Sequence, residues 1–96
     1  MPKYIIERNI PNAGQLSNNE LHAISQNSCG VLQELGAKIQ WNHSYVMNDK
    51  IICEYIASEE NLVRVHAEKG GFPVDAIYEV KTTIDPTTAE WVVKNK

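Results

Sequence analysis

The sequence predicts an α+β fold in which a four-stranded antiparallel sheet carries two helices on one face. A β-hairpin pattern occupies residues 39–57, where two runs rich in Ile, Val, Tyr and Trp flank Asn48-Asp49, a pair that tolerates the positive φ angles of a tight turn. A helix pattern stands on either side of this hairpin, and a strand pattern lies at each outer end. This βαββαβ order is the ferredoxin-like arrangement, in which right-handed crossovers place both helices on the same face.

The first strand is predicted over residues 3–9, and a loop containing Pro and Gly ends it. The first helix then has clear boundary signals. Ser17 can cap its start, Glu20 three residues later completes a capping box, and Gly36 supplies the stop. Its inward stripe recurs at helical spacing and consists of Leu21, Ile24, Ser28, Val31, Leu32 and Leu35.

The hairpin register depends on the turn. A two-residue turn pairs Ser44 with Cys53, His43 with Glu54, Asn42 with Tyr55, and Trp41 with Ile56. A three-residue loop would instead place His43 beside Cys53. With the shorter turn, one face carries small or slim residues suited to a helix, namely Asn42, Ser44, Val46, Ile51, Cys53, Tyr55 and Ala57. The other face carries Ile39, Trp41, His43, Tyr45, Ile52, Glu54 and Ile56.

The second helix is predicted over about residues 59–69, with Ser58 as N-cap and a Gly pair as its end. Its predicted inward positions are Leu62, Val65, His66 and Lys69. A last strand over residues 76–84 follows. The tail, residues 85–96, contains Trp91-Val92-Val93, which is too apolar for a free end, so we expect it to dock on this subunit or on a partner. Residues 1–96 thus form a single domain with a C-terminal tail.

Composition excludes several classes of function. With 9 basic and 12 acidic residues and no basic run, the chain has no electrostatic footprint for nucleic acid or an anionic membrane. It has neither a transmembrane-length apolar run nor a signal-peptide pattern, so a cytoplasmic location is expected. Cys29 and Cys53 are too far apart for a C-x-x-C motif, which favours reduced thiols. No phosphate-loop, dinucleotide, zincin or serine-hydrolase motif is present.

The fold raises the question of what covers the second sheet face. Large residues such as Trp41, Tyr45 and Ile56 would lie there, and burying each is worth roughly 1.5–3 kcal/mol. We therefore expect a homodimer that packs sheet against sheet around a two-fold axis, in the manner of dimeric α/β barrels. If this face instead lies under the helices, the smaller Ser44/Cys53 face is the open one and the argument for a dimer weakens.

Two groups of side chains could hold a metal ion. His43 and Glu54 are opposed on adjacent strands, with Cβ atoms expected roughly 4.5–5.5 Å apart, and a two-fold partner would supply a second pair. An ordinary cross-strand ion pair is the simpler interpretation. The second group is Cys53 with His66, near Ser44 and Tyr55, where a thiolate and an imidazole would suit nickel, copper or zinc or make a nucleophile. A satisfied core Cys and His is again the simpler interpretation.

Arg8 is a candidate anchor for a carboxylate ligand, and Glu7 a candidate base or metal ligand. Because adjacent strand residues point to opposite faces, only one of them can serve a given site. The alternative is a strand-end ion pair with Asp85 or Glu90. A small-molecule site would combine Arg8 with Tyr45 and Tyr55.

Five segments resemble those of a small bacterial family of largely unknown function whose named representatives are described as nickel-binding proteins. They are YIIER (4–8), WNHSYV (41–46), DKIICEYIA (49–57), VHA (65–67) and GFP (71–73). The resemblance extends over about residues 2–88. It implies a ferredoxin-like fold, dimerisation and nickel binding.

Three functional hypotheses follow. The first is a small cytoplasmic protein that binds a divalent transition metal, by resemblance nickel, for sequestration or sensing. The second is a small-molecule-binding or enzymatic dimeric α/β-barrel protein that uses the cavity between sheet and helices, with Tyr45, Tyr55, His66 or Cys53, and it requires roughly 300 Å³ or more. The third is a protein-interaction module, which would expose a large apolar patch even as a dimer.

Overall fold

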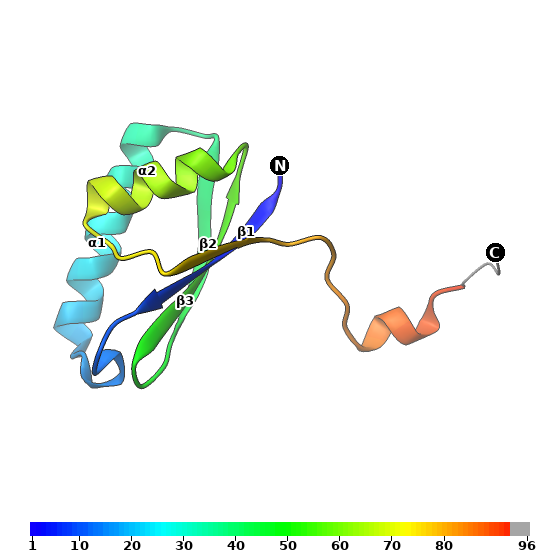
Figure 1. The fold of residues 1–96 in the computed structure, drawn as a ribbon, viewed down its shortest axis with the longest axis horizontal. Coiled ribbons are helices and arrows are strands. Elements are labelled where there is room, and N and C mark those ends of the chain that lie inside the picture. The colour runs from blue at the N-terminus through cyan, green and yellow to red at the C-terminus, as the bar shows by residue number, and fades with distance from the viewer. Residues whose placement is uncertain (93–96) are drawn as a thin grey trace.

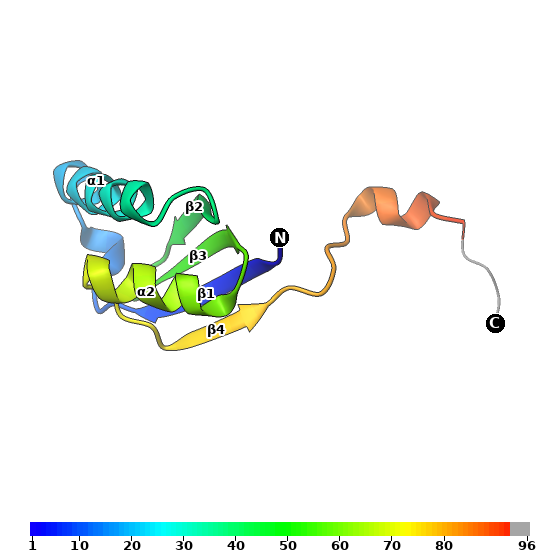
Figure 2. The ribbon, with the colours of Figure 1, turned by 90° about the horizontal axis from the view of Figure 1, so that it is seen from above.

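The structure, a computed structural model that describes residues 1–92, has the predicted order of elements (Figure 1). Its helices and strands are β1 (Lys3–Asn9), α1 (Asn18–Leu35), β2 (Ile39–Val46), β3 (Lys50–Ala57), α2 (Glu60–Gly70) and β4 (Ala76–Glu79). The strands are antiparallel and lie in the order β2-β3-β1-β4. Figure 2 shows both helices on one side of this sheet. The ferredoxin-like α+β fold is therefore confirmed.

Helix α1 begins and ends where the sequence predicts. The Ser17 hydroxyl accepts from the Glu20 backbone N–H at 3.1 Å, and the Glu20 carboxylate accepts from the Ser17 backbone N–H at 3.1 Å. The hydrogen bond from the Ser17 backbone lowers the pKa of Glu20. Gly36 ends the helix with a φ of 84°, an angle that costs glycine little.

Helix α2 begins one residue later than the predicted boundary, and Glu59 rather than Ser58 is its N-cap. Within the described part of the chain, no side-chain hydrogen bond caps this end. The buried residues are Val63, His66 and Ala67, whereas Lys69 is exposed. The prediction was thus right for His66 and wrong for Lys69. The prediction missed Val63, which lies three and four residues before His66 and Ala67 and therefore on the same helix face.

The β2–β3 hairpin keeps the two-residue register only near its turn. Ser44 pairs with Cys53 and His43 with Glu54, as predicted. A bulge between Trp41 and His43 then shifts the register by one. The predicted pairing of Trp41 with Ile56 was wrong for this reason, since Trp41 pairs with Tyr55.

The bulge also changes which residues share a face. Trp41 and Ile39 belong to the helix-covered face, where Ile39 is 3% exposed, so the prediction that they lie on the open face was wrong. The covered face carries Tyr4, Ile6, Arg8, Ile39, Trp41, Ser44, Ile51, Cys53, Tyr55 and Ala57. By alternation, the uncovered face carries Ile5, Glu7, His43, Tyr45, Ile52, Glu54, Ile56 and Tyr78. This second set is a mixture of apolar and charged side chains.

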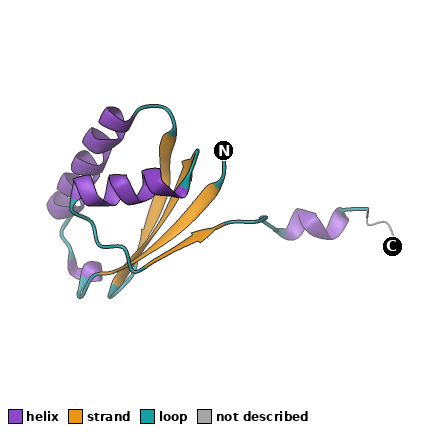
Figure 3. Cartoon of the chain, turned by 45° about the horizontal axis from the view of Figure 1, so that its top comes forward, coloured by secondary structure: helices purple, strands orange, loops and turns teal. Residues whose placement is uncertain are grey.

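Strand β4 is shorter than predicted: it ends at Glu79, and after a last hydrogen bond from the Val80 N–H to the Lys3 carbonyl the chain leaves the sheet instead of pairing as far as residue 84. It then runs away from the domain and forms a short 3-10 helix at Pro86–Glu90, as Figure 3 shows. Trp91 is 57% exposed and Val92 95% exposed. Docking of the tail on its own subunit was therefore wrong for these two residues, and Val93 lies outside the described residues. Docking on a partner stays a prediction.

Within residues 1–92, no helix combines the length and the apolar character that crossing a membrane requires.

Candidate functional site

The covered face of the sheet buries a permanent positive charge. Arg8 is only 3% exposed. Its Nη1 donates to the Pro73 carbonyl at 2.6 Å, its Nη2 to the Tyr55 hydroxyl at 3.4 Å, and its Nε to Cys53 Sγ at 3.5 Å. The Phe72 ring lies 5.3 Å from the guanidinium carbon, a distance at which the ring face attracts a cation. None of these four neighbours is a carboxylate, so the predicted ion pair of Arg8 with Asp85 or Glu90 does not form.

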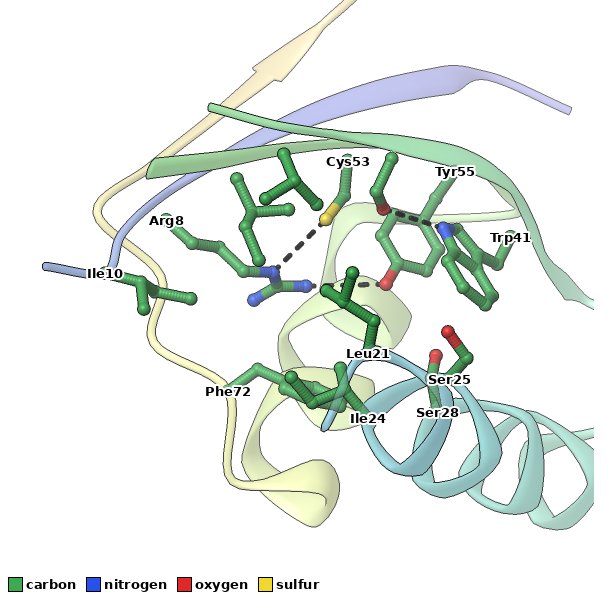
Figure 4. A pocket seen from close by; sticks show the side chains of 13 residues that line it. Arg8, Ile10, Leu21, Ile24, Ser25, Ser28, Trp41, Cys53, Tyr55 and Phe72 are labelled. Atoms are coloured by element: carbon green, nitrogen blue, oxygen red, sulfur yellow. Dashed lines mark hydrogen bonds between the residues drawn. The ribbon is translucent and has the colours of Figure 1, made fainter. Parts of the chain in front are cut away.

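A cavity of about 100 Å³ lies beside this guanidinium, between α1 and the sheet (Figure 4). Its walls are almost wholly apolar. The lining residues are Arg8, Ile10, Leu21, Ile24, Ser25, Ser28, Trp41, Ser44, Val46, Ile51, Cys53, Tyr55 and Phe72. Trp41 donates its indole N–H to the Ser44 hydroxyl at 2.9 Å, which satisfies both groups at the wall. The volume is below the roughly 300 Å³ of a typical metabolite site, so the cavity suits only a small ligand.

His66 is fully buried next to Tyr55 and Phe72, two of the residues that line this cavity. Its ring centroid is 5.1 Å from that of Tyr55 and 5.6 Å from that of Phe72. Nε2 lies 3.0 Å from the Ser28 hydroxyl, whereas Nδ1 is buried and has no hydrogen-bond partner among residues 1–92. Burial, and then the charge of Arg8, lower the pKa of His66 from 6.5 to about 4. The imidazole is therefore neutral at physiological pH.

Tyr55 contacts both Arg8 and His66. Burial raises the pKa of its phenol, so the hydroxyl stays protonated at neutral pH and accepts from Arg8.

The two glycines at the end of α2 explain how the Phe72 ring comes to lie against both His66 and Arg8. Gly71 adopts a left-handed φ of 72°, and the Phe72 N–H then donates to the Ala67 carbonyl at 2.8 Å. A Cβ on Gly70 would collide with the Phe72 ring. The Gly70-Gly71-Phe72 segment thus folds the aromatic ring back over the site.

The uncovered face holds the His43–Glu54 pair. His43 Nε2 lies 3.9 Å from Glu54 Oε1. The other Glu54 oxygen lies 3.8 Å from Lys3 Nζ and accepts from Asn42 Nδ2 at 2.8 Å. The His43 side chain is 47% exposed and that of Glu54 21% exposed. Both are accessible from solvent and opposed as predicted.

The structure separates residues that the sequence grouped together. Tyr45 is 60% exposed on the uncovered face, so it shares no cavity with Tyr55 and Arg8. Glu7 pairs with Lys50 at 3.4 Å on that same face. Cys53 contacts Arg8, and His66 contacts Ser28, with no hydrogen bond joining the two within the described chain.

Among residues 1–92, no group of three or more His, Cys, Asp or Glu side chains converges for a metal. Sequence reasoning also missed Ser28, Phe72 and Pro73 as neighbours of His66 and Arg8. The only signal for the last two was the glycine pair before them, which marks a tight return of the chain.

Two comparisons with known proteins, one of structure and one of sequence, point to the same family. The crystal structure of SCO4226 from Streptomyces coelicolor A3(2) superposes with a TM-score of 0.72 at 17% sequence identity, and the match covers 85% of this chain and 99% of that one. At this identity the likeness shows the fold alone. No curated protein matches the chain. The family described as nickel responsive protein SCO4226-like matches residues 4–80, which contain both α-helices and all of the sheet except Lys3, and the chain therefore belongs to that family.

Proposed function

We propose that this protein binds Ni²⁺ and serves in nickel sequestration or sensing. The observation that carries the proposal is the family match over residues 4–80, because the family is described as nickel responsive.

His43 and Glu54 are the ligands that the geometry favours. An imidazole and a carboxylate suit a borderline divalent ion such as Ni²⁺. The two groups already face each other at 3.9 Å, so small side-chain rotations would bring both to one ion. Their exposure leaves a path for the hydrated ion to enter. The carboxylate is held by Asn42, which would orient it as outer-shell partners orient metal ligands elsewhere.

One chain offers only two protein ligands in this pair, so the remaining positions require water or a second copy. Residues of the uncovered face that favour association are Ile5, Tyr45, Ile52, Ile56 and Tyr78, of which Tyr45 and Tyr78 are more than half exposed. A homodimer that packs these faces around a two-fold axis near His43 would supply a second His43–Glu54 pair.

Cys53 and His66 are weaker candidates for a metal site. The Cys53 sulfur accepts from the Arg8 guanidinium, whose positive charge would repel a divalent cation at short range. His66 is fully buried, and its Nε2 is engaged by Ser28.

Calorimetric titration of untagged protein with Ni²⁺ tests the proposal. We expect saturable binding at micromolar concentration, with His43→Ala and Glu54→Gln each weakening it by roughly tenfold or more, as loss of a metal ligand or its partner does. His22→Ala, which removes an exposed imidazole on α1, is the matched control and should bind normally. Absence of saturable binding would remove the nickel function.

The same samples report on the ligand set and on assembly. Normal binding by His43→Ala with loss in His66→Ala would transfer the site to the covered face. Sedimentation at micromolar concentration should give a dimer, and a monomer that still binds Ni²⁺ tightly would remove the shared site.

A further inference from the structure

The position of Arg8 is unusual because its charge is buried and has no counter-ion among residues 1–92. Within the part of the chain that the structure describes, no Asp or Glu oxygen lies within ion-pair distance of the guanidinium, whereas Arg64 on the surface has its Glu60 partner at 3.0 Å. A buried charge is normally paired, because removing it from water is strongly unfavourable. The arginine side chain cannot escape this cost by losing its proton.

The hydrogen bonds of Arg8 leave part of its capacity unused. A guanidinium has five N–H donors, and three contacts are made here, to Pro73, Tyr55 and Cys53. The contact to sulfur at 3.5 Å and the contact to the phenol at 3.4 Å are both long. Neutral acceptors and the Phe72 ring therefore hold the group in place but do not balance its charge.

The cavity adjoins this charge and carries no acidic side chain among its lining residues. Figure 4 shows the guanidinium in the space between the sheet above and Leu21, Ile24 and Phe72 below. Away from Arg8 the lining side chains are mostly aliphatic and aromatic, with Ser25, Ser28 and Ser44 as small polar members. Such a site combines one cation at one end with an apolar slot, which is the pattern of a pocket for a small amphiphilic anion.

The volume limits the size of that anion. An engineered apolar cavity of about 150 Å³ accepts benzene, so the 100 Å³ found here holds a somewhat smaller molecule. A carboxylate matches the planar fork of a guanidinium and carries a single negative charge, which balances Arg8 alone.

We propose that this cavity is a binding site for a short-chain monocarboxylate of about two to four carbons, whose carboxylate pairs with Arg8 and whose alkyl chain lies against Leu21, Ile24 and Ile51. The site lies on the face of the sheet opposite His43 and Glu54, and it is independent of the proposed nickel function.

Titration of metal-free wild-type protein with acetate, propionate, butyrate and hexanoate, followed by NMR chemical shifts of the Arg8 and Trp41 side-chain N–H groups, tests the proposal. We expect saturable shifts for propionate and butyrate, and weaker binding of hexanoate because it exceeds the cavity. Propionamide, the neutral isostere, should bind at least tenfold more weakly, since it lacks the charge-assisted pair. Equal binding of propionamide, or of chloride and phosphate, would overturn the carboxylate assignment. Lack of any saturable shift with the four acids would overturn the site.

Two variants test separately the role of the Arg8 charge and the role of the apolar cavity. Arg8→Met should abolish binding of propionate, with Arg64→Met as the control that removes an exposed arginine and keeps binding. Because Arg8 also holds the Pro73 carbonyl, its replacement can unfold the protein. Ser25→Leu keeps Arg8 and fills the cavity from α1, so it should lose propionate binding at least tenfold while retaining the fold. Undiminished binding by Ser25→Leu would place the ligand elsewhere and overturn the proposal.

Discussion

The two faces of the sheet show how the same residue types acquire different chemistry. On the covered face, His66 is neutral and enclosed by aromatic rings, and Arg8 is enclosed by neutral acceptors. On the uncovered face, the His43 side chain is about half exposed and that of Glu54 partly exposed, and Lys3 lies near the same carboxylate. The properties of the side chains on the covered face are thus set by their packing, and those on the uncovered face by their contact with solvent. On the uncovered face a cation can reach the His43–Glu54 pair from solvent, whereas on the covered face a small anion would meet the Arg8 charge, which no carboxylate among residues 1–92 balances.

Neighbouring isoleucines of β1 give the largest expected contrast between the faces. Ile6 is 0% exposed under the helices, and Ile5 is half-buried on the other side. We expect Ile6→Ala to lower the free energy of unfolding by about 2–5 kcal/mol, because it removes buried methyl groups and leaves a cavity. Ile5→Ala should cost about 1 kcal/mol in the monomer. Urea unfolding at low protein concentration measures both.

Repeating that measurement over a range of protein concentrations sharpens the comparison. If a second copy covers the uncovered face, the cost of Ile5→Ala rises with concentration, because association stabilises only the folded chain. A cost that equals that of Ile6→Ala even in dilute monomer would contradict the assignment of Ile5 to an uncovered face.

The neutral state of His66 predicts an acid-sensitive core. Its pKa falls from 6.5 in the unfolded chain to about 4 in the folded one, so between these values the unfolded chain binds the extra proton. The stability contribution is fully present above about pH 6.5 and is lost as the pH falls towards 4. The loss amounts to about 3 kcal/mol between pH 8 and pH 4. Urea unfolding across this pH range measures it.

Replacement of the ring isolates this contribution. His66→Phe keeps an aromatic ring between Tyr55 and Phe72 but cannot titrate, so most of the loss assigned to His66 should disappear. His22→Gln removes an exposed imidazole and should retain it. An unchanged pH dependence in His66→Phe would mean that other groups, the carboxylates included, dominate the acid response.

The fold could be predicted because its signals are local. The capping box of Ser17 and Glu20, the stop at Gly36 and the turn at Asn48-Asp49 each act within a few residues of the chain. The bulge at Asn42 could not be predicted, because it depends on how β2 packs Trp41 beneath a helix. This one extra residue places Trp41 and Ile39 on the covered face of the sheet. The uncovered face is therefore less apolar than the sequence predicted.

The sites were less predictable because they depend on contacts distant in sequence. The opposition of His43 and Glu54 follows from the register alone and was found. The contact between Arg8 and Pro73 spans most of the domain, and the Ser28–His66 pair joins two helices. Nothing local in the sequence marks either contact. Alternation along β1 shows only that Arg8 and Glu7 point to opposite faces, not which face is buried.

The smallest effect concerns the His43–Glu54 pair in the absence of metal. At 3.9 Å and with a half-exposed imidazole, the pair should couple by less than about 0.5 kcal/mol in a double-mutant cycle of His43→Ala and Glu54→Gln. Glu54 also keeps Lys3 and Asn42 as neighbours, which compensates for loss of the imidazole. If the proposed site is correct, saturating Ni²⁺ should raise the apparent coupling, because the ion would bind the folded protein most tightly when both ligands are present. A coupling that is already large without metal would identify the pair as a structural ion pair. The ion pair alone would then explain why His43 and Glu54 face each other, and a metal would not be required.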